Sequence, residues 1–330
     1  MAQNLYYNSS LIPRTSEVTD RIILTQYNQL NYCLNGLILD RVSLLIAPTN
    51  AGKSCFSSSL IIDAIKQGIN TFLFAGEDGG AEARDRVYRQ YLGADKNNYE
   101  YVAYVSNGKN TNAGENLIKP EKFAEAKAFF DDKLFIYNNN FPATRENLIN
   151  CLTEAHTRDN CRFFVIDNCE MFNLDGEYYN ENQAMKEICV ALRQFAITKK
   201  CHILIISHIK KTERNICRPE IFDCKGTSSL TNIAKNILSL IRTDTINPNT
   251  QEYKDLAKII ELNGYKVEES AAVVEILKTK GRKNGIISLG FNAISNSYYE
   301  RRKFGDPVDD KVVTYVPANK QEQLEIDSIF

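Results

Sequence analysis

Short apolar runs alternate with amphipathic segments along most of this chain. The runs are rich in β-branched and aromatic residues, and several are almost continuously apolar, which is typical of parallel strands covered on both faces. We expect parallel strands at 41–47, 71–76, 133–138, 162–167, 202–207 and 236–242. Two further runs, at 271–278 and 285–291, flank the segment KGRKNG and are expected to pair as a hairpin.

Helical patterns fill most of the intervals between these runs. Residues 53–67 form one such pattern and are followed by a glycine, which is suited to a helix C-terminus. Apolar residues recur at helical spacing over 185–196, so this segment predicts an amphipathic helix. We expect a loop at 105–118, which is rich in Asn and Gly, and one helix within the polar segment 244–270. Strands that alternate with helices predict an α/β fold with a mostly parallel central sheet flanked by helices.

The composition narrows the class of protein. The 330 residues are 43% hydrophobic and 25% charged, as in ordinary globular proteins, and no apolar run approaches the length of a membrane-spanning helix. Forty basic and 41 acidic residues give a net charge of -1, so any nucleic-acid site must be a local basic patch. Nine cysteines without a C-x-x-C pair predict reduced thiols in a cytoplasmic compartment rather than a metal site.

A phosphate-binding loop is indicated at 47–54, APTNAGKS, between a predicted strand and a predicted helix. Backbone N–H groups at a helix N-terminus cradle phosphates, the loop lysine (Lys53) reaches the β- and γ-phosphates, and the Ser54 hydroxyl binds Mg²⁺. The first position is Ala47, where Gly is usual. The loop therefore predicts binding of ATP or another nucleoside triphosphate, with Mg²⁺, by Thr49, Asn50, Ala51, Gly52, Lys53, Ser54 and Cys55.

Three polar residues stand at the ends of other predicted strands. Asp167 is placed to hold Mg²⁺ directly or through water, although such a residue alone is often a turn cap. Glu77 is placed to orient the water that attacks the γ-phosphate, and Asp78 competes for this role. His208 is placed to contact the γ-phosphate, although a lone histidine is more often structural.

Six motifs in order resemble the RecA-like ATPase domain of DnaB/Twinkle-type hexameric replicative helicases, including phage and plasmid relatives. They are the phosphate loop, FAGED, VIDN, LIISHIKK, FDCKGTSSLTNIAKNILSLIR and ILKTKGRKNGIISLGF, and the resemblance covers residues 28–300. It implies that Glu77 is the catalytic carboxylate, that Asp167 binds Mg²⁺ and that His208 senses the γ-phosphate. One departure is Lys235, which stands where the family often has Asp.

The resemblance also implies contacts with other molecules. Lys280 and Arg282 match the basic pair that a neighbouring subunit inserts into the active site, although the match requires one extra residue in this segment. Arg242 and Phe291 match the pair that encloses the nucleotide base. The segment after His208 matches the loop that faces single-stranded DNA, and its basic residues are Lys210, Lys211, Arg214, Arg218 and Lys225.

We therefore expect an N-terminal arm at 1–27 that contacts a neighbouring subunit, a RecA-like ATPase domain at 28–305 and a tail at 306–330. The expected function is that of an ATP-dependent replicative DNA helicase, a hexameric ring that translocates on single-stranded DNA. The expected partners are single-stranded DNA, further copies of the chain, and a primase, polymerase or loader. No membrane partner is expected, and a phage or plasmid source is favoured.

Two other functions remain open on the sequence. A RecA/RadA-like recombination ATPase would form an open filament, and the absence of an obvious strand-exchange module disfavours it. A nucleotide-gated DNA-binding or loader module would bind ATP without unwinding DNA. A small-molecule kinase is least favoured, because no arginine-rich lid stands out.

Overall fold

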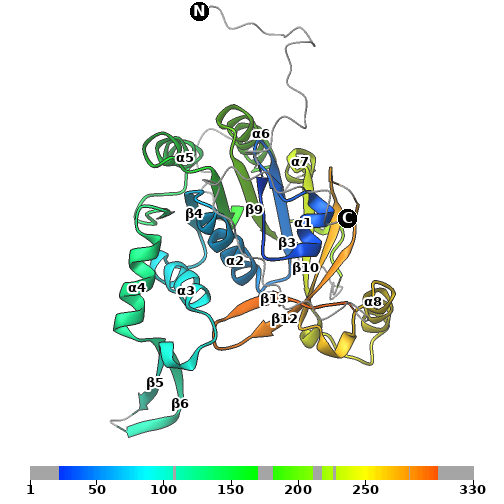
Figure 1. Ribbon diagram of the computed structural model, residues 1–330. Coiled ribbons are helices and arrows are strands. Elements are labelled where there is room, and N and C mark those ends of the chain that lie inside the picture. The colour runs from blue at the N-terminus through cyan, green and yellow to red at the C-terminus, as the bar shows by residue number, and fades with distance from the viewer. Residues whose placement is uncertain are drawn as a thin grey trace, which may run out of the picture.

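The computed structural model describes residues 22–106, 109–169, 181–210, 218–225, 228–281 and 283–303. A nine-stranded sheet forms its centre (Figure 1). The sheet contains β3 (Val42–Ala47), β4 (Thr71–Ala75), β7 (Leu134–Ile136), β8 (Phe163–Asp167), β9 (His202–His208), β10 (Asn236–Arg242), β11 (Ala272–Lys278), β12 (Ile286–Asn292) and β13 (Ser297–Glu300). Its order is β13-β12-β11-β10-β3-β9-β8-β4-β7. The parallel part of the sheet consists of β10, β3, β9, β8, β4 and β7. Strands β11, β12 and β13 add an antiparallel edge next to β10. The predicted α/β fold and C-terminal hairpin are therefore confirmed.

Helices cover both faces of the sheet. They are α1 (Asn28–Leu34), α2 (Lys53–Lys66), α3 (Gly80–Leu92), α4 (Pro120–Phe130), α5 (Arg145–Asp159), α6 (Glu181–Lys199), α7 (Ser228–Ile233) and α8 (Gln251–Leu262). Alternate strand residues pack into two separate clusters: Leu45 and Val165 with α1 to α4, and Leu44 and Phe164 with α5 to α7. This division explains the continuously apolar runs, because both side-chain directions of each strand are buried.

The helix expected within 244–270 is α8, and it lies between two short 3₁₀ turns, η7 (Thr243–Thr245) and η8 (Val267–Glu269). Leu256 and Ile260 of this helix form a small separate apolar cluster with residues of β10, β11 and β12. Near the start of the described chain, α1 lies between β1 (Ile22–Ile23) and β2 (Leu37–Ile38), and Tyr27 stacks on Phe56 of α2 with ring centroids 5.1 Å apart. Most of the expected arm and the tail lie outside the described residues.

The prediction of a loop at 105–118 was wrong. Two strands, β5 (Tyr99–Ser106) and β6 (Lys109–Ile118), pair antiparallel after the short turn η4 (Lys96–Asn98) and extend away from the sheet as a hairpin (Figure 1). The Asn- and Gly-rich strand lacks an alternating pattern of its own and is formed by pairing with the more apolar segment before it. Arg89 of α3 holds the base of the hairpin, since its guanidinium donates to the Asn116 carbonyl and lies 5.2 Å from the Tyr99 ring centroid.

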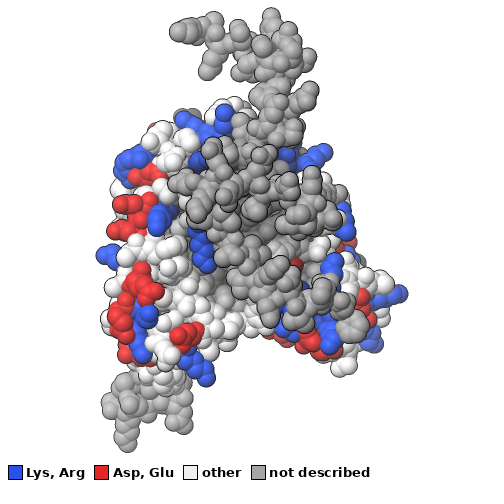
Figure 2. Space-filling view, in the orientation of Figure 1, with Lys and Arg blue, Asp and Glu red and all other residues white. Residues whose placement is uncertain are grey.

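The described surface carries mixed charge, and several of the described cysteines are buried. Basic and acidic side chains are interspersed over the described residues of the face shown in Figure 2. The eight cysteines within the described ranges are thiols rather than disulfides, and burial raises the pKa of Cys161, Cys189 and Cys201 to about 12. Among the described helices, none combines the length and the apolar composition that a bilayer crossing requires.

His202, the first residue of β9, is a buried titratable group in the middle of the sheet. The side chain is 0% exposed, and its Nδ1 lies 2.7 Å from the Ile38 carbonyl oxygen. Its Nε2 finds no hydrogen-bond partner within the part of the chain that the structure describes. Burial lowers the pKa of His202 to about 4, so the folded protein holds this imidazole neutral.

We expect the protein to lose stability as the pH falls from about 6.5 to about 4, because unfolded His202 binds a proton at its ordinary pKa and the folded residue does not. This group alone lowers the free energy of unfolding by about 2 kcal/mol between pH 7 and pH 5. In His202→Asn the amide retains a donor for the Ile38 carbonyl but does not titrate. Urea unfolding at both pH values measures the difference, and an equal pH dependence in variant and wild type would contradict the prediction.

Candidate functional site

A cavity of about 310 Å³ opens where β3, β4, β9 and β10 end. The crevice outside the carboxyl ends of parallel strands is the common ligand site of open α/β sheets. Its walls come from the loop after β3, the start of α2, the segment after β4, the ends of β9 and β10, and the β12–β13 turn. The lining residues are Thr49, Asn50, Gly52, Lys53, Ser54, Cys55, Glu77, Asp78, Arg86, His208, Arg242, Asp244, Ala271, Phe291, Asn296 and Tyr298.

The loop between β3 and α2 requires glycine at one position. Gly52 has φ of 84°, in the left-handed region, and its carbonyl accepts the first helical bond from Phe56 at 2.9 Å. A Cβ on Gly52 would lie 2.3 Å from the hydroxyl oxygen of Tyr298, and this hydroxyl donates to the Ala51 carbonyl at 3.1 Å. Both the backbone conformation and the space beside Tyr298 therefore exclude a side chain at this position.

Lys53, His208 and Glu77 form a continuous chain of polar contacts across the cavity. Lys53 Nζ donates to the Pro48 carbonyl at 2.9 Å and lies 3.0 Å from His208 Nδ1. His208 Nε2 lies 2.6 Å from Glu77 Oε1, which also accepts a bond from the Asn168 side chain at 2.6 Å. A neutral imidazole that carries its proton on Nε2 satisfies both of its contacts. The structure thus brings together three residues, with His208 lying 155 positions from Lys53 and 131 from Glu77 in the sequence.

Asp167 and Ser54 present the oxygen atoms that a hard divalent cation prefers. Asp167, the last residue of β8, is 5% exposed, and its Oδ1 has no hydrogen-bond partner among the described residues. Burial raises the pKa of this carboxyl, while a hydrogen bond from Ser54 and the charges of Arg86 and Lys53 oppose the rise. The described ranges contain no group of three or more His, Cys, Asp or Glu that could hold a metal alone. This donor set fits Mg²⁺, which commonly takes one or two protein oxygens together with phosphates and water.

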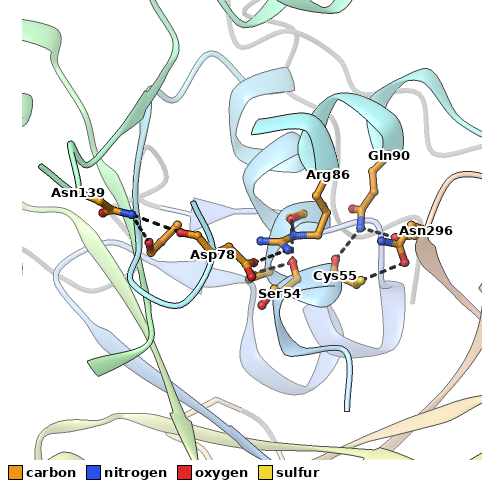
Figure 3. Close-up of polar contacts among 10 residues, drawn as sticks. Ser54, Cys55, Asp78, Arg86, Gln90, Asn139 and Asn296 are labelled. Atoms are coloured by element: carbon orange, nitrogen blue, oxygen red, sulfur yellow. Dashed lines mark hydrogen bonds and ion pairs between the residues drawn. The ribbon is translucent and has the colours of Figure 1, made fainter. Parts of the chain in front are cut away.

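Helix α3 contributes residues to the cavity that sequence analysis did not assign. Arg86 pairs with Asp78 at 2.5 Å and also donates to Ser58 Oγ at 3.4 Å (Figure 3). One turn later, Gln90 donates to the carbonyls of Cys55 and Asn296, at 3.0 and 2.6 Å. Arg86 and Gln90 stand four residues apart, at the spacing of one helix face, and this spacing is the sequence signal that could have indicated them. The helix thereby fastens the start of α2 to the β12–β13 turn.

The residues expected at the base of the nucleotide also line the cavity. Arg242 ends β10 and Phe291 lies near the end of β12, and both line the same space. The Phe291 ring packs on Tyr298 with centroids 5.3 Å apart and is 40% exposed. Arg242 donates from Nε to Asp244 Oδ1 at 2.9 Å, with a second contact from Nη2 to Oδ2. Sequence analysis missed Asp244 and Tyr298.

Lys280 lies at the opposite end of the strands from this cavity. It follows β11, which runs antiparallel to β10, and Thr279 donates to the Asn236 side chain at the first residue of β10. The seven residues of β10 span roughly 20 Å. The exposed Lys280 side chain is therefore remote from the cavity of its own subunit. Arg282 lies outside the described residues.

The basic residues expected near DNA are described only in part. Lys210 Nζ donates to the Phe222 carbonyl at 2.9 Å, next to the short turn η6 (Ile221–Asp223). Arg218 makes two bonds to Glu275, at 2.9 and 2.6 Å, so its charge is paired within the subunit. The Lys225 N–H donates to the His208 carbonyl at 2.8 Å and ties this segment to the cavity. Lys211 and Arg214 lie outside the described residues.

A parallel α/β sheet with a phosphate loop, a buried strand-end carboxylate and a lysine aimed across the loop defines a P-loop nucleotide-binding protein. The family model described as an AAA domain matches residues 9–214, more than half of the chain. The protein belongs to this family.

Solved structures show the same fold. One of them, the ATPase domain of another protein, superposes with a TM-score of 0.63 over 87% of this chain and 94% of that domain, at 16% identity. A DnaB-like replicative helicase, solved for its interactions with primase, superposes with a TM-score of 0.61 over 84% of this chain, also at 16% identity. This chain spans 63% of the length of that helicase chain. The predicted resemblance to the RecA-like ATPase domains of DnaB-type helicases is confirmed as a likeness of fold.

We expect Gly52→Ala to abolish tight nucleotide binding, because the new Cβ collides with Tyr298 and forces the loop to move. Gly68→Ala is the matched control: Gly68 also has positive φ, at 77°, but a Cβ there meets nothing within 4 Å. The control should cost about 1 kcal/mol of stability and leave binding unchanged. Titration with a fluorescent ATP analogue measures both, and wild-type affinity in Gly52→Ala would contradict the steric argument.

Proposed function

We propose that the protein is an ATP-dependent DNA helicase that assembles as a ring, with hexamer the expected size, and translocates on single-stranded DNA. One observation carries this proposal. Lys280 stands at the opposite end of the strands from a cavity that already holds other residues expected to contact the phosphates. A basic residue so placed can complete the site of a neighbouring copy but not its own. The fold likeness to DnaB-type ATPase domains supports the same assignment.

Within one subunit, the cavity supplies the groups that bind and cleave a triphosphate. Lys53 leaves its carbonyl partners to neutralise the phosphates. Ser54 and Asp167 would hold Mg²⁺, which would supply positive charge to the phosphoryl oxygens. Glu77 orients the attacking water and accepts its proton. His208 contacts both Lys53 and Glu77, so a γ-phosphate that displaces one contact changes the other.

His208 also provides a route from the nucleotide to DNA. Its carbonyl is bonded to the Lys225 N–H, and Lys210 follows it by two residues. A shift of His208 on γ-phosphate release therefore moves the backbone of the segment proposed to contact DNA. We retain Lys210, Lys211, Arg214, Arg218 and Lys225 as the DNA-contacting set, with Arg218 bound to DNA only if it leaves Glu275.

The assembly and its partners follow from the same proposal. Residues 1–27 act as an arm on a neighbouring subunit, 28–305 as the ATPase domain and 306–330 as a tail. A primase is named with one of the similar structures, and we propose a primase, polymerase or loader as a partner of this chain. The cytoplasm and a phage or plasmid source remain predictions.

We expect Arg282→Ala to reduce ATP turnover at least 100-fold, since an arginine supplied by a neighbour is typically worth about 10³–10⁵ in rate. Wild-type turnover should rise steeply with protein concentration and with single-stranded DNA. Mixing the variant with Lys53→Ala protein should restore some activity, because each can supply what the other lacks.

Turnover that depends on neither protein concentration nor DNA, and that survives Arg282→Ala, would instead favour the nucleotide-gated binding module. A filament rather than a ring on DNA, seen by electron microscopy, would favour the recombination ATPase. Lys53→Ala protein that still unwinds a forked duplex would exclude the helicase mechanism.

We expect Glu77→Gln to lower kcat at least 100-fold and to leave ATP affinity within about threefold of wild type, because a catalytic base acts in the transition state. The amide keeps an oxygen that accepts from His208 and Asn168 but cannot take a proton. Asp78→Asn is the comparison, since this carboxylate pairs with Arg86. A larger kcat loss in Asp78→Asn would reassign the catalytic role.

A further inference from the structure

Arg242 is held by a neighbouring carboxylate in the wall of the cavity. The last residue of β10 is Arg242, and Asp244 lies two residues later in η7. Two roughly parallel hydrogen bonds join the guanidinium to both oxygens of Asp244. They raise the pKa of Arg242, so the group stays charged. The turn is itself closed by a bond from Thr245 Oγ1 to the Arg242 carbonyl at 3.0 Å.

The guanidinium and an aromatic ring both line the same space. Side-chain exposure is 37% for Arg242 and 47% for Asp244, and Phe291 is 40% exposed. Phe291 is in turn backed by Tyr298, whose hydroxyl is bonded to the phosphate loop. A flat ligand that enters the cavity beside these residues meets an aromatic ring backed by Tyr298 and a guanidinium bonded to Asp244.

An unpaired arginine at this position would be poorly suited to stacking. Its side chain carries about 2 kcal/mol of rotamer entropy, and stacking on a base requires one orientation of the guanidinium plane. A bound triphosphate would also attract the free cation toward its phosphates, since unit charges interact over several ångströms in a partly buried site. Two bonds to one carboxylate oppose both effects, because they fix the plane and balance the charge.

We propose that Asp244 is a positioning residue that holds the Arg242 guanidinium flat against the nucleotide base. The inference rests on the proposed function in one respect, that the cavity takes a nucleoside triphosphate whose base lies between Arg242 and Phe291. The negative charge of Asp244 disfavours any pose that brings the phosphates next to it.

The experiment compares a ligand that has a base with one that has none. Dissociation constants for ATP and for inorganic tripolyphosphate are measured with Mg²⁺ present, and their ratio reports the contribution of the nucleoside. Stacking of a base is worth about 1–3 kcal/mol, so Arg242→Ala should weaken ATP binding roughly tenfold or more relative to tripolyphosphate. We expect Asp244→Ala to weaken ATP binding roughly fivefold relative to tripolyphosphate binding, since Arg242 remains but is no longer oriented.

A double variant tests whether Asp244 acts through Arg242. Adding Asp244→Ala to Arg242→Ala should change the ratio by less than about twofold, whereas independent contributions would multiply. Glu261→Ala removes an exposed carboxylate from α8 and is the control for the change in net charge. It should leave the ratio at the wild-type value.

Two failures are distinguishable. An unchanged ratio in Asp244→Ala, or independent effects in the double variant, would overturn the positioning role even if Arg242→Ala weakens ATP binding. A wild-type protein that binds ATP no more tightly than tripolyphosphate would overturn the base site itself, and with it this part of the proposed function.

Discussion

The register of the parallel strands is the constraint on which the site depends. Ala47 pairs with His208 between β3 and β9, and Ala75 pairs with Asp167 between β4 and β8. These two pairings place the start of the phosphate loop beside the histidine and the buried carboxylate beside the segment that carries Glu77. A slip of one residue in either pair would turn the side chains to the other face of the sheet. The apolar clusters on both faces prevent such a slip, so the packing of the core fixes the geometry of the cavity.

The antiparallel edge gives the domain two unlike ends. Strands β10 and β11 are neighbours that run in opposite directions. The chain therefore leaves the cavity at Arg242 and reaches Lys280 at the far end of these strands. The same strand pair therefore carries a cavity-lining residue at one end and an exposed cation at the other. A head-to-tail arrangement of copies would bring these two ends together, whereas a two-fold arrangement would not.

Much of the fold could be predicted from the sequence, because the parallel strands are apolar on both faces and their runs are bounded by polar residues. The predicted strands of the main sheet begin and end within two residues of the observed limits. The β5–β6 hairpin could not be predicted, since its second strand has turn-forming composition and depends on its partner. The phosphate-loop motif predicted a glycine at position 52, but the side chain that leaves no room for a Cβ there is Tyr298, 246 residues away. No local sequence pattern indicates such a contact. For the same reason the pairing of Arg218 with Glu275, 57 residues away, could not be predicted from the sequence.

Helix α3 gives the hairpin a mechanical connection to the cavity. Arg86 and Gln90 attach the helix to the walls of the cavity, and Arg89, between them, attaches it to the base of β6. The longer strand of the hairpin, β6, runs from this attachment at Asn116 to Lys109, a span of about 23 Å. A rotation of α3 by about 5° would move the far end of β6 by roughly 2 Å, by simple geometry from the strand rise. A change at the phosphate loop that rotated α3 would therefore be enlarged at the far end of this hairpin.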